Sequence, residues 1–117
     1  MTYERKKLGF RGENLALNFL ERKGFVLLGR NVRQKFGEID LLMKDKDTIV
    51  VVEVKTKKSD LFGLPQEEVD WHKRRKLVRL AQAVAQKFPE SKIRIDVAAV
   101  DDHSEKLDYI YSAVEDS

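Results

Sequence analysis

Cysteine is absent from this chain of 117 residues, and histidine, proline and tryptophan are scarce, with two, two and one residues. Without thiols the protein can form neither disulfides nor a thiolate metal site. The two histidines, His72 and His103, are too few and too scattered for a histidine-based metal site. A Ser-His-Asp pattern, a P-loop and a dinucleotide-binding fingerprint are also missing. Carboxylates are therefore the side chains to consider as metal ligands.

Long apolar segments are missing as well. The longest aliphatic run, residues 49–52, is far too short to cross a membrane, and the N-terminal residues have no apolar stretch typical of a signal peptide. We therefore expect a cytoplasmic protein with no membrane partner. The length fits a single domain, 1–117, and 42% hydrophobic residues are enough for one core. The net charge of +3 permits an anionic partner without requiring one.

The hydrophobic pattern predicts two helices and four or five strands. Helices are expected over 8–23, where Gly24 is a candidate C-cap, and from an N-cap at Asp70 to Phe88, before Pro89. Strands are expected over 25–33, 38–43, 48–57, 93–100 and 109–114, with a polar turn at 44–47 and a loop at 58–68. The order α-β-β-β-α-β predicts an α/β fold in which two helices cover a mixed sheet.

The segment IVVVEVKTK, residues 49–57, combines a buried-strand sequence with charged side chains. Because strand side chains alternate between the two faces of a sheet, one face carries only valines and Thr56. The other face changes from Val51 to Glu53 and Lys55 halfway along the strand. A charge at such a place must be paired, solvated in a cleft or bound to a ligand.

Three acidic residues are expected to converge beside this strand. If Lys44 pairs with Asp47 across the turn, opposed residue numbers sum to about 91, so Asp40 and Glu53 become diagonal neighbours on one face. Glu13 falls inside the apolar arc of the first helix, the arc that should pack on a sheet. Crowded carboxylates resist ionisation unless a cation joins them, and oxygen ligands suit Mg²⁺ or Mn²⁺. These residues therefore predict a metal site.

Basic residues open the second predicted helix, in the sequence HKRRK at 72–76. Cations in a first helical turn oppose the helix dipole, and bound phosphates would compensate for this. We therefore expect nucleic-acid contacts from Lys73, Arg74 and Arg75. A basic rim around the acidic centre would also include Arg33, Lys35, Lys57 and Lys58.

Four segments of the chain resemble a known family: RGENLALNFL at 11–20, GEIDLLM at 37–43, VVEVKTK at 51–57 and KRRKL at 73–77. They are similar to segments of the YraN-type family of small bacterial proteins, a branch of the PD-(D/E)xK nuclease superfamily close to archaeal Holliday-junction resolvases. The superfamily core is restriction-endonuclease-like, with the same α-β-β-β-α-β order. The proline of the superfamily name is absent, because Ile39 precedes Asp40.

This resemblance implies a Mg²⁺- or Mn²⁺-dependent endonuclease that hydrolyses phosphodiester bonds in nucleic acid, with structured or branched DNA as the favoured substrate. It makes Glu13 the helix acid, Asp40 the signature acid, and Glu53 with Lys55 the (D/E)xK pair. The main-chain carbonyl of Val54 would also face the metal, and Lys55 would handle the attacking water. Resolvases of this fold are dimers, so the resemblance leaves a homodimer open.

Other interpretations of these residues remain open at this point. Glu53 and Lys55 could belong to a cross-strand salt bridge at a sheet edge. Glu13 could favour the dipole of a helix that begins just before it. Taken whole, the chain could be a non-cleaving nucleic-acid-binding or adaptor domain on a nuclease fold, or a structural partner of another protein. Two further acids are expected outside the site, Glu38 at its rim and Asp96 in an ion pair with Arg94.

Overall fold

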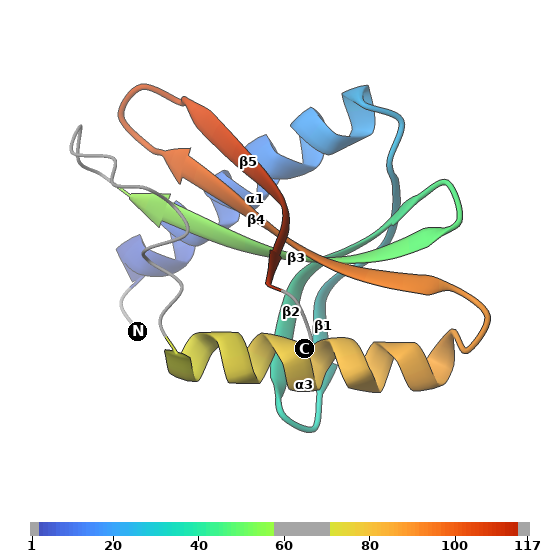
Figure 1. Ribbon diagram of the computed structural model, residues 1–117. Coiled ribbons are helices and arrows are strands. Elements are labelled where there is room, and N and C mark those ends of the chain that lie inside the picture. Colours follow the sequence, from blue (N-terminus) through green and yellow to red (C-terminus); the bar gives the residue numbers. More distant parts are fainter. Residues whose placement is uncertain (1–2, 58–70, 115–117) are drawn as a thin grey trace.

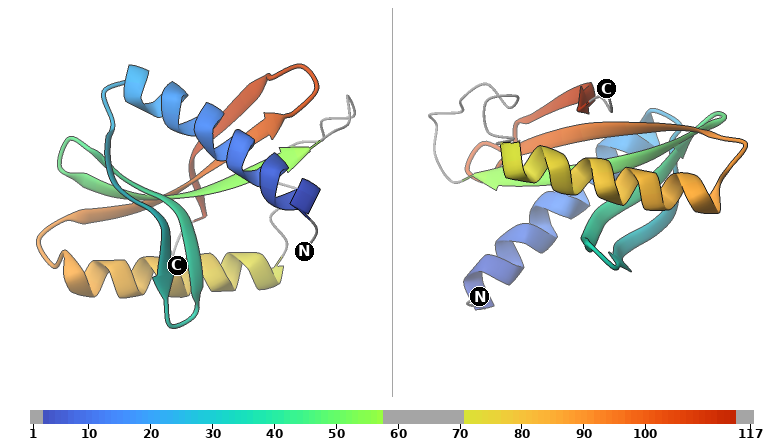
Figure 2. Two further views of the ribbon diagram at one scale, coloured as in Figure 1. Left: turned by 180° about the vertical axis from the view of Figure 1, so that it is seen from behind. Right: turned by 60° about the horizontal axis from the view of Figure 1, so that its bottom comes forward.

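The computed structural model describes residues 3–57 and 71–114, which form one five-stranded sheet with a helix packed on each face (Figures 1 and 2). The helices are α1 (Tyr3–Arg22) and α3 (Trp71–Lys87). The strands are β1 (Val26–Gln34), β2 (Gly37–Asp45), β3 (Thr48–Lys57), β4 (Lys92–Asp101) and β5 (Leu107–Val114). The order α1-β1-β2-β3-α3-β4, followed by β5, confirms the predicted α/β fold class with its restriction-endonuclease-like core.

The sheet is mixed, and its strands follow the order β1-β2-β3-β4-β5. The first three strands form an antiparallel meander, β4 is parallel to β3, and β5 is antiparallel to β4. Parallel neighbours need a crossover, and the connection from β3 to β4 contains α3. β3 therefore lies in the centre of the sheet, hydrogen-bonded on both sides, rather than at an edge.

Each face of the sheet has its own apolar core, and alternate side chains of β3 belong to the two cores. The α1-side core includes Ala16, Leu20, Leu41, Met43, Val50 and Val52. The α3-side core includes Leu42, Val51, Leu77, Leu80, Val84 and Val97. Glu53 and Lys55 continue the series of Val51, as the period of two requires, and so belong to the α3 side.

Gly24 ends α1 in a Schellman motif, which confirms the predicted C-cap. Its φ is +93°, its N–H donates to Glu21 O at 3.0 Å, and the N–H of Phe25 donates to Leu20 O at 3.0 Å. The helix begins at Tyr3, five residues earlier than predicted. Neither described helix is long and apolar enough to cross a membrane.

The register between β2 and β3 differs by two residues from the prediction, which was wrong. Leu41 lies opposite Val52 and Met43 opposite Val50, so paired residue numbers sum to 93. This register gives Met43 a valine partner, whereas the predicted one would have given it Thr48. A shift of two residues does not exchange the two faces of a strand, and Asp40 and Glu53 lie close enough for their charges to interact.

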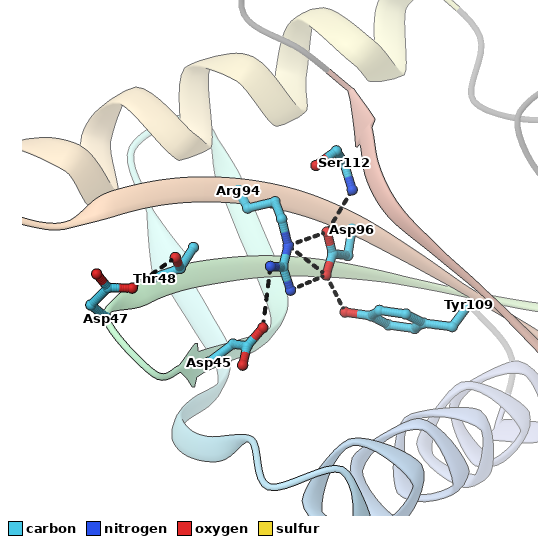
Figure 3. A network of polar contacts seen from close by, with 7 residues as sticks. All are labelled: Asp45, Asp47, Thr48, Arg94, Asp96, Tyr109 and Ser112. Carbon is cyan, nitrogen blue, oxygen red and sulfur yellow. Dashed lines mark hydrogen bonds and ion pairs between the residues drawn. The ribbon is translucent and has the colours of Figure 1, made fainter.

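A buried polar network joins β4 to its neighbours (Figure 3). Asp96 is fully buried, and its Oδ1 lies 2.9 Å from Arg94 Nε, which confirms the predicted ion pair. Tyr109 Oη donates to Asp96 Oδ2 at 2.6 Å, and the Ser112 N–H donates to Oδ1 at 2.8 Å. Burial, followed by the charge of Asp96, raises the pKa of Tyr109, which stays a protonated donor. Arg94 also reaches Asp45 at 3.2 Å, so the network ties β2, β4 and β5 together.

Candidate metal and nucleic-acid site

β2 and β3 separate at Asp40. Their registered pairing ends at Leu41 and Val52, while β3 continues beside β4 as far as Lys57. Asp40 Oδ2 accepts a hydrogen bond from the Val54 N–H at 2.8 Å. The carboxylate thus serves as the acceptor that a neighbouring strand would otherwise provide, and this contact fixes Asp40 at the fork.

Glu53 extends from the same stretch of β3 toward the beginning of α3. Its Oε1 lies 3.0 Å from Lys73 Nζ, and its side chain is only 15% exposed. The side chain of Lys55 lies close to Lys73 as well. The cross-strand salt bridge considered for Glu53 at a sheet edge is therefore wrong, because β3 is central and the partner comes from α3.

The Asp40 carboxyl is electrostatically strained. Burial, and then the negative charges of Glu53 and Glu13, raise its pKa from 3.8 to about 7, although the Val54 N–H and Lys73 oppose the shift. Burial lowers the pKa of Lys73, but its interactions with Glu53, Lys55 and Asp40 outweigh this and raise it. Lys73 therefore stays protonated and partly offsets two carboxylates that repel each other.

Glu13 lies near this pair but has partners of its own. Its Oε1 accepts hydrogen bonds from Arg30 Nε at 3.2 Å and from Asn31 Nδ2 at 3.3 Å. Arg30 is held in turn by Asn14 Oδ1 at 2.7 Å and by the main-chain oxygen of Phe10 at 3.2 Å. Because α1 begins ten residues before Glu13, the interpretation of Glu13 as an acid at a helix start is wrong.

Sequence reasoning missed Arg30 and Asn31. Asn31 adopts a left-handed conformation, with φ of 52°, in the middle of β1. Asparagine tolerates this conformation better than most residues, so an asparagine inside a predicted strand was the available signal. Its position between the pairs Arg30↔Leu41 and Val32↔Ile39 places it across from Asp40.

The structure therefore brings Asp40, Glu53, Lys55 and Lys73 together and leaves Glu13 beside them, held by β1. Among the side chains that the structure describes, no three carboxylate or imidazole groups converge closely enough to hold a metal ion. The residues fit Mg²⁺ or Mn²⁺ as a two-carboxylate site, because Mg²⁺ is commonly bound by one or two carboxylates while water and substrate phosphates complete its shell. The contacts with Val54 and Lys73 involve Asp40 Oδ2 and Glu53 Oε1, one oxygen of each carboxylate.

Further basic side chains follow Lys73 along α3. Arg74, Arg75 and Lys76 are exposed, and the first turn of α3 contains no acidic residue. Arg33 is 92% exposed and lies 3.9 Å from Glu38, which is itself exposed; the placement of Glu38 at the rim of the site stays a prediction. Lys57 ends β3, its side chain is not described, and Lys58 and the predicted N-cap Asp70 lie outside the described residues.

Comparison with protein-family models matches residues 12–100 to the family described as Uncharacterised protein family UPF0102. The chain belongs to this family. It is 43% identical over 105 residues to a UPF0102 protein of Caldanaerobacter subterraneus subsp. tengcongensis, covering 88% of this chain and 86% of that one. A UPF0102 protein of Thermodesulfovibrio yellowstonii is 41% identical over 110 residues, covering 93% and 96%. This membership confirms the YraN-type family expected from the sequence.

A solved structure described as the EndoMS–dsDNA2 complex contains a chain that is 25% identical to this one, with a TM-score of 0.42. The overlap covers 61% of this chain and 26% of the other. The present chain thus spans about a quarter of that protein. The observed element order agrees with the α-β-β-β-α-β core expected from the sequence.

Proposed function

We propose that this protein is a divalent-metal-dependent endonuclease that hydrolyses phosphodiester bonds in structured or branched DNA. The observation that supports it best is the fork between β2 and β3, where the Val54 N–H fixes the Asp40 carboxylate. Burial and the charge of Glu53 raise the pKa of this carboxyl group. Folding places two repelling carboxylates side by side in a part-buried position, which a protein tolerates most readily where a cation will join them.

Asp40 and Glu53 would hold the metal, together with the main-chain carbonyl of Val54 that the family resemblance assigns. When bound, Mg²⁺ or Mn²⁺ would polarise a phosphodiester and lower the pKa of a coordinated water. Lys55 would orient the attacking water and stabilise charge on the phosphate. Glu13 would assist by adding negative charge beside Asp40.

Lys73, Arg74 and Arg75, with Lys57 at the end of β3, would bind the DNA backbone. Lys73 has a second role in this proposal, because its ammonium group forms a salt bridge with Glu53 in the protein without DNA. Phosphates would draw Lys73 away from Glu53, and the carboxylate would then be available to the metal. Metal affinity should therefore be weak alone and stronger when DNA is present.

The same salt bridge favours a second candidate, a nucleic-acid-binding domain without turnover. If Lys73 remains on Glu53 at 3.0 Å when DNA binds, the chain supplies its own cation and no metal is needed. This candidate predicts DNA binding that ignores divalent metal and survives the loss of Asp40.

The test compares wild type with Asp40→Asn, Glu53→Gln and the control Asp108→Asn, which replaces an exposed carboxylate on β5. Branched and linear DNA are incubated with each protein in Mg²⁺ or Mn²⁺. We expect cleavage by wild type and by the control, and none by the two site variants. Melting curves with non-cleavable phosphorothioate DNA should show that metal stabilises only proteins with an intact site.

Binding without cleavage by all four proteins, in Mn²⁺ as well as Mg²⁺, would support the non-cleaving domain instead. A Lys73→Gln variant separates the two roles of Lys73. We expect it to respond to metal alone at lower concentration than wild type, because Glu53 has lost its internal cation. A homodimer stays a prediction, and its test is the mass of the protein in solution.

A further inference from the structure

An aromatic side chain lies exposed at the tip of the hairpin that joins β1 and β2. The turn consists of Lys35 and Phe36 between the paired residues Gln34 and Gly37, and Phe36 is 45% exposed. The tip reaches across α3, as Figure 1 shows. Gly37 lies so close to Lys76 that an added Cβ would overlap its side chain. The hairpin and the helix therefore form a shared surface.

That surface contains a groove lined by Phe36, Arg75, Lys76 and Arg79, which we call the hairpin groove. Its four lining residues, all described, include three cations and no carboxylate. The Arg79 guanidinium lies 5.4 Å from the centre of the Phe36 ring, and Lys35 Nζ lies 5.7 Å from it. Both distances are near the outer limit of about 6 Å for a cation–π contact, so these two side chains engage the ring only weakly.

An aromatic ring surrounded by cations is a surface that single-stranded nucleic acids recognise. Bases stack on aromatic side chains, and Lys and Arg beside them bind the phosphates. A base inside a duplex is already stacked on its neighbours and has no free face. The groove would therefore discriminate in favour of a nucleotide that is unpaired.

The groove is also at a suitable distance from the acidic centre. Lys73, which contacts Glu53, and Arg79 are on the same helix, six residues apart, which corresponds to about 9 Å along its axis. At 3.4 Å per nucleotide, this is about three nucleotides of a stacked strand. One strand could pass from the groove to the two carboxylates without a break.

We propose that the hairpin groove binds an unpaired nucleotide of DNA, with the base on Phe36 and the phosphate held by Arg75, Lys76 and Arg79. This inference rests on the proposed function for its substrate, DNA, and narrows the substrate class. The favoured substrate has a single-stranded tail, flap or gap close to the cleaved bond, and a fully paired junction is bound less well.

The test measures DNA binding in EDTA, where no cleavage occurs. Fluorescence anisotropy compares a blunt duplex, the same duplex with a short single-stranded tail, and the tail alone. Phe36→Leu removes the ring and keeps apolar bulk, while Phe36→Trp keeps a stacking surface. Tyr111→Leu is the matched control, because Tyr111 is 48% exposed on the distant strand β5 and has the Arg94 guanidinium 5.2 Å from its ring centre.

We expect wild type to bind the tailed duplex more tightly than the blunt one. Phe36→Leu should weaken binding of the tail and of the tailed duplex by about 5- to 150-fold and leave the blunt duplex unchanged. Phe36→Trp should retain the preference for the tail, and Tyr111→Leu should resemble wild type. Arg79→Gln should reduce the salt dependence of DNA binding by the amount expected for about one phosphate contact. Lys87→Gln, at the far end of α3, should leave this salt dependence unchanged.

Equal weakening of blunt and tailed duplexes by Phe36→Leu, or no weakening of either, would overturn the assignment of the groove. The two proposals fail separately. If Phe36→Leu shows that the groove gives no preference for the tail while cleavage still depends on Asp40, only the proposal for the groove is refuted. If the tail preference depends on Phe36 but the protein never cleaves DNA, only the proposed nuclease activity is refuted.

Discussion

Replacing Asp40 by asparagine should make the protein more stable. Asparagine can still accept the hydrogen bond from Val54, but it carries no charge to be repelled by Glu53. The rise in pKa from 3.8 to about 7 corresponds to roughly 4 kcal/mol at 1.36 kcal/mol per unit. Since the amide is also a polar group in a part-buried place, we expect a gain of about 2 to 4 kcal/mol in the free energy of unfolding at pH 8.

The stability gained by Asp40→Asn should depend on pH, and the raised pKa of Asp40 determines whether it grows or shrinks as the pH rises. Between about pH 4 and pH 7 the folded protein retains a proton that the unfolded chain has released, so wild-type stability falls as pH rises through this window. Below it Asp40 is protonated in both states and the penalty vanishes. The advantage of Asp40→Asn should therefore shrink to less than about 1 kcal/mol at pH 4.

Urea unfolding of both proteins at pH 4 and pH 8 measures this difference. Asp108→Asn serves as the control, because Asp108 is exposed on β5 and its replacement should leave stability unchanged within about 0.5 kcal/mol. An Asp40→Asn protein that is less stable than wild type at pH 8, or equally stabilised at both pH values, would refute the reasoning. Functional sites often contain residues that lower the stability of the folded protein, and Asp40 would be one of them.

Three further substitutions test the scaffold in urea melts. Gly12→Ala should cost about 1 to 3 kcal/mol, because an added Cβ would overlap Thr56 Oγ1, and Thr56→Ala should restore part of the loss. Gly24→Ala should cost about 1 to 2 kcal/mol, because φ there is +93°. Asp96→Ala should cost about 3 to 5 kcal/mol by leaving Arg94 without its buried partner (Figure 3), and a loss below 1 kcal/mol would contradict that role.

The sequence alone determined which face of the sheet each residue of β3 occupies. Alternation is a local property of the backbone, so the charges at Glu53 and Lys55 could be assigned to one face before any pairing was known. The same locality explains why the error in register did little harm. The true register differs by two residues, and a shift of two does not exchange the faces of the strands.

Only the tertiary structure decided which charges meet. Lys73 reaches Glu53, and Arg30 reaches Glu13, across 20 and 17 residues of sequence. These contacts depend on where α3 and α1 settle on the two faces of the sheet, which the packing of two separate cores fixes. No local pattern carries that information, because helix placement is set by many contacts between distant residues. The sequence thus supplied the acidic residues of the site, and the fold supplied the cations that hold them.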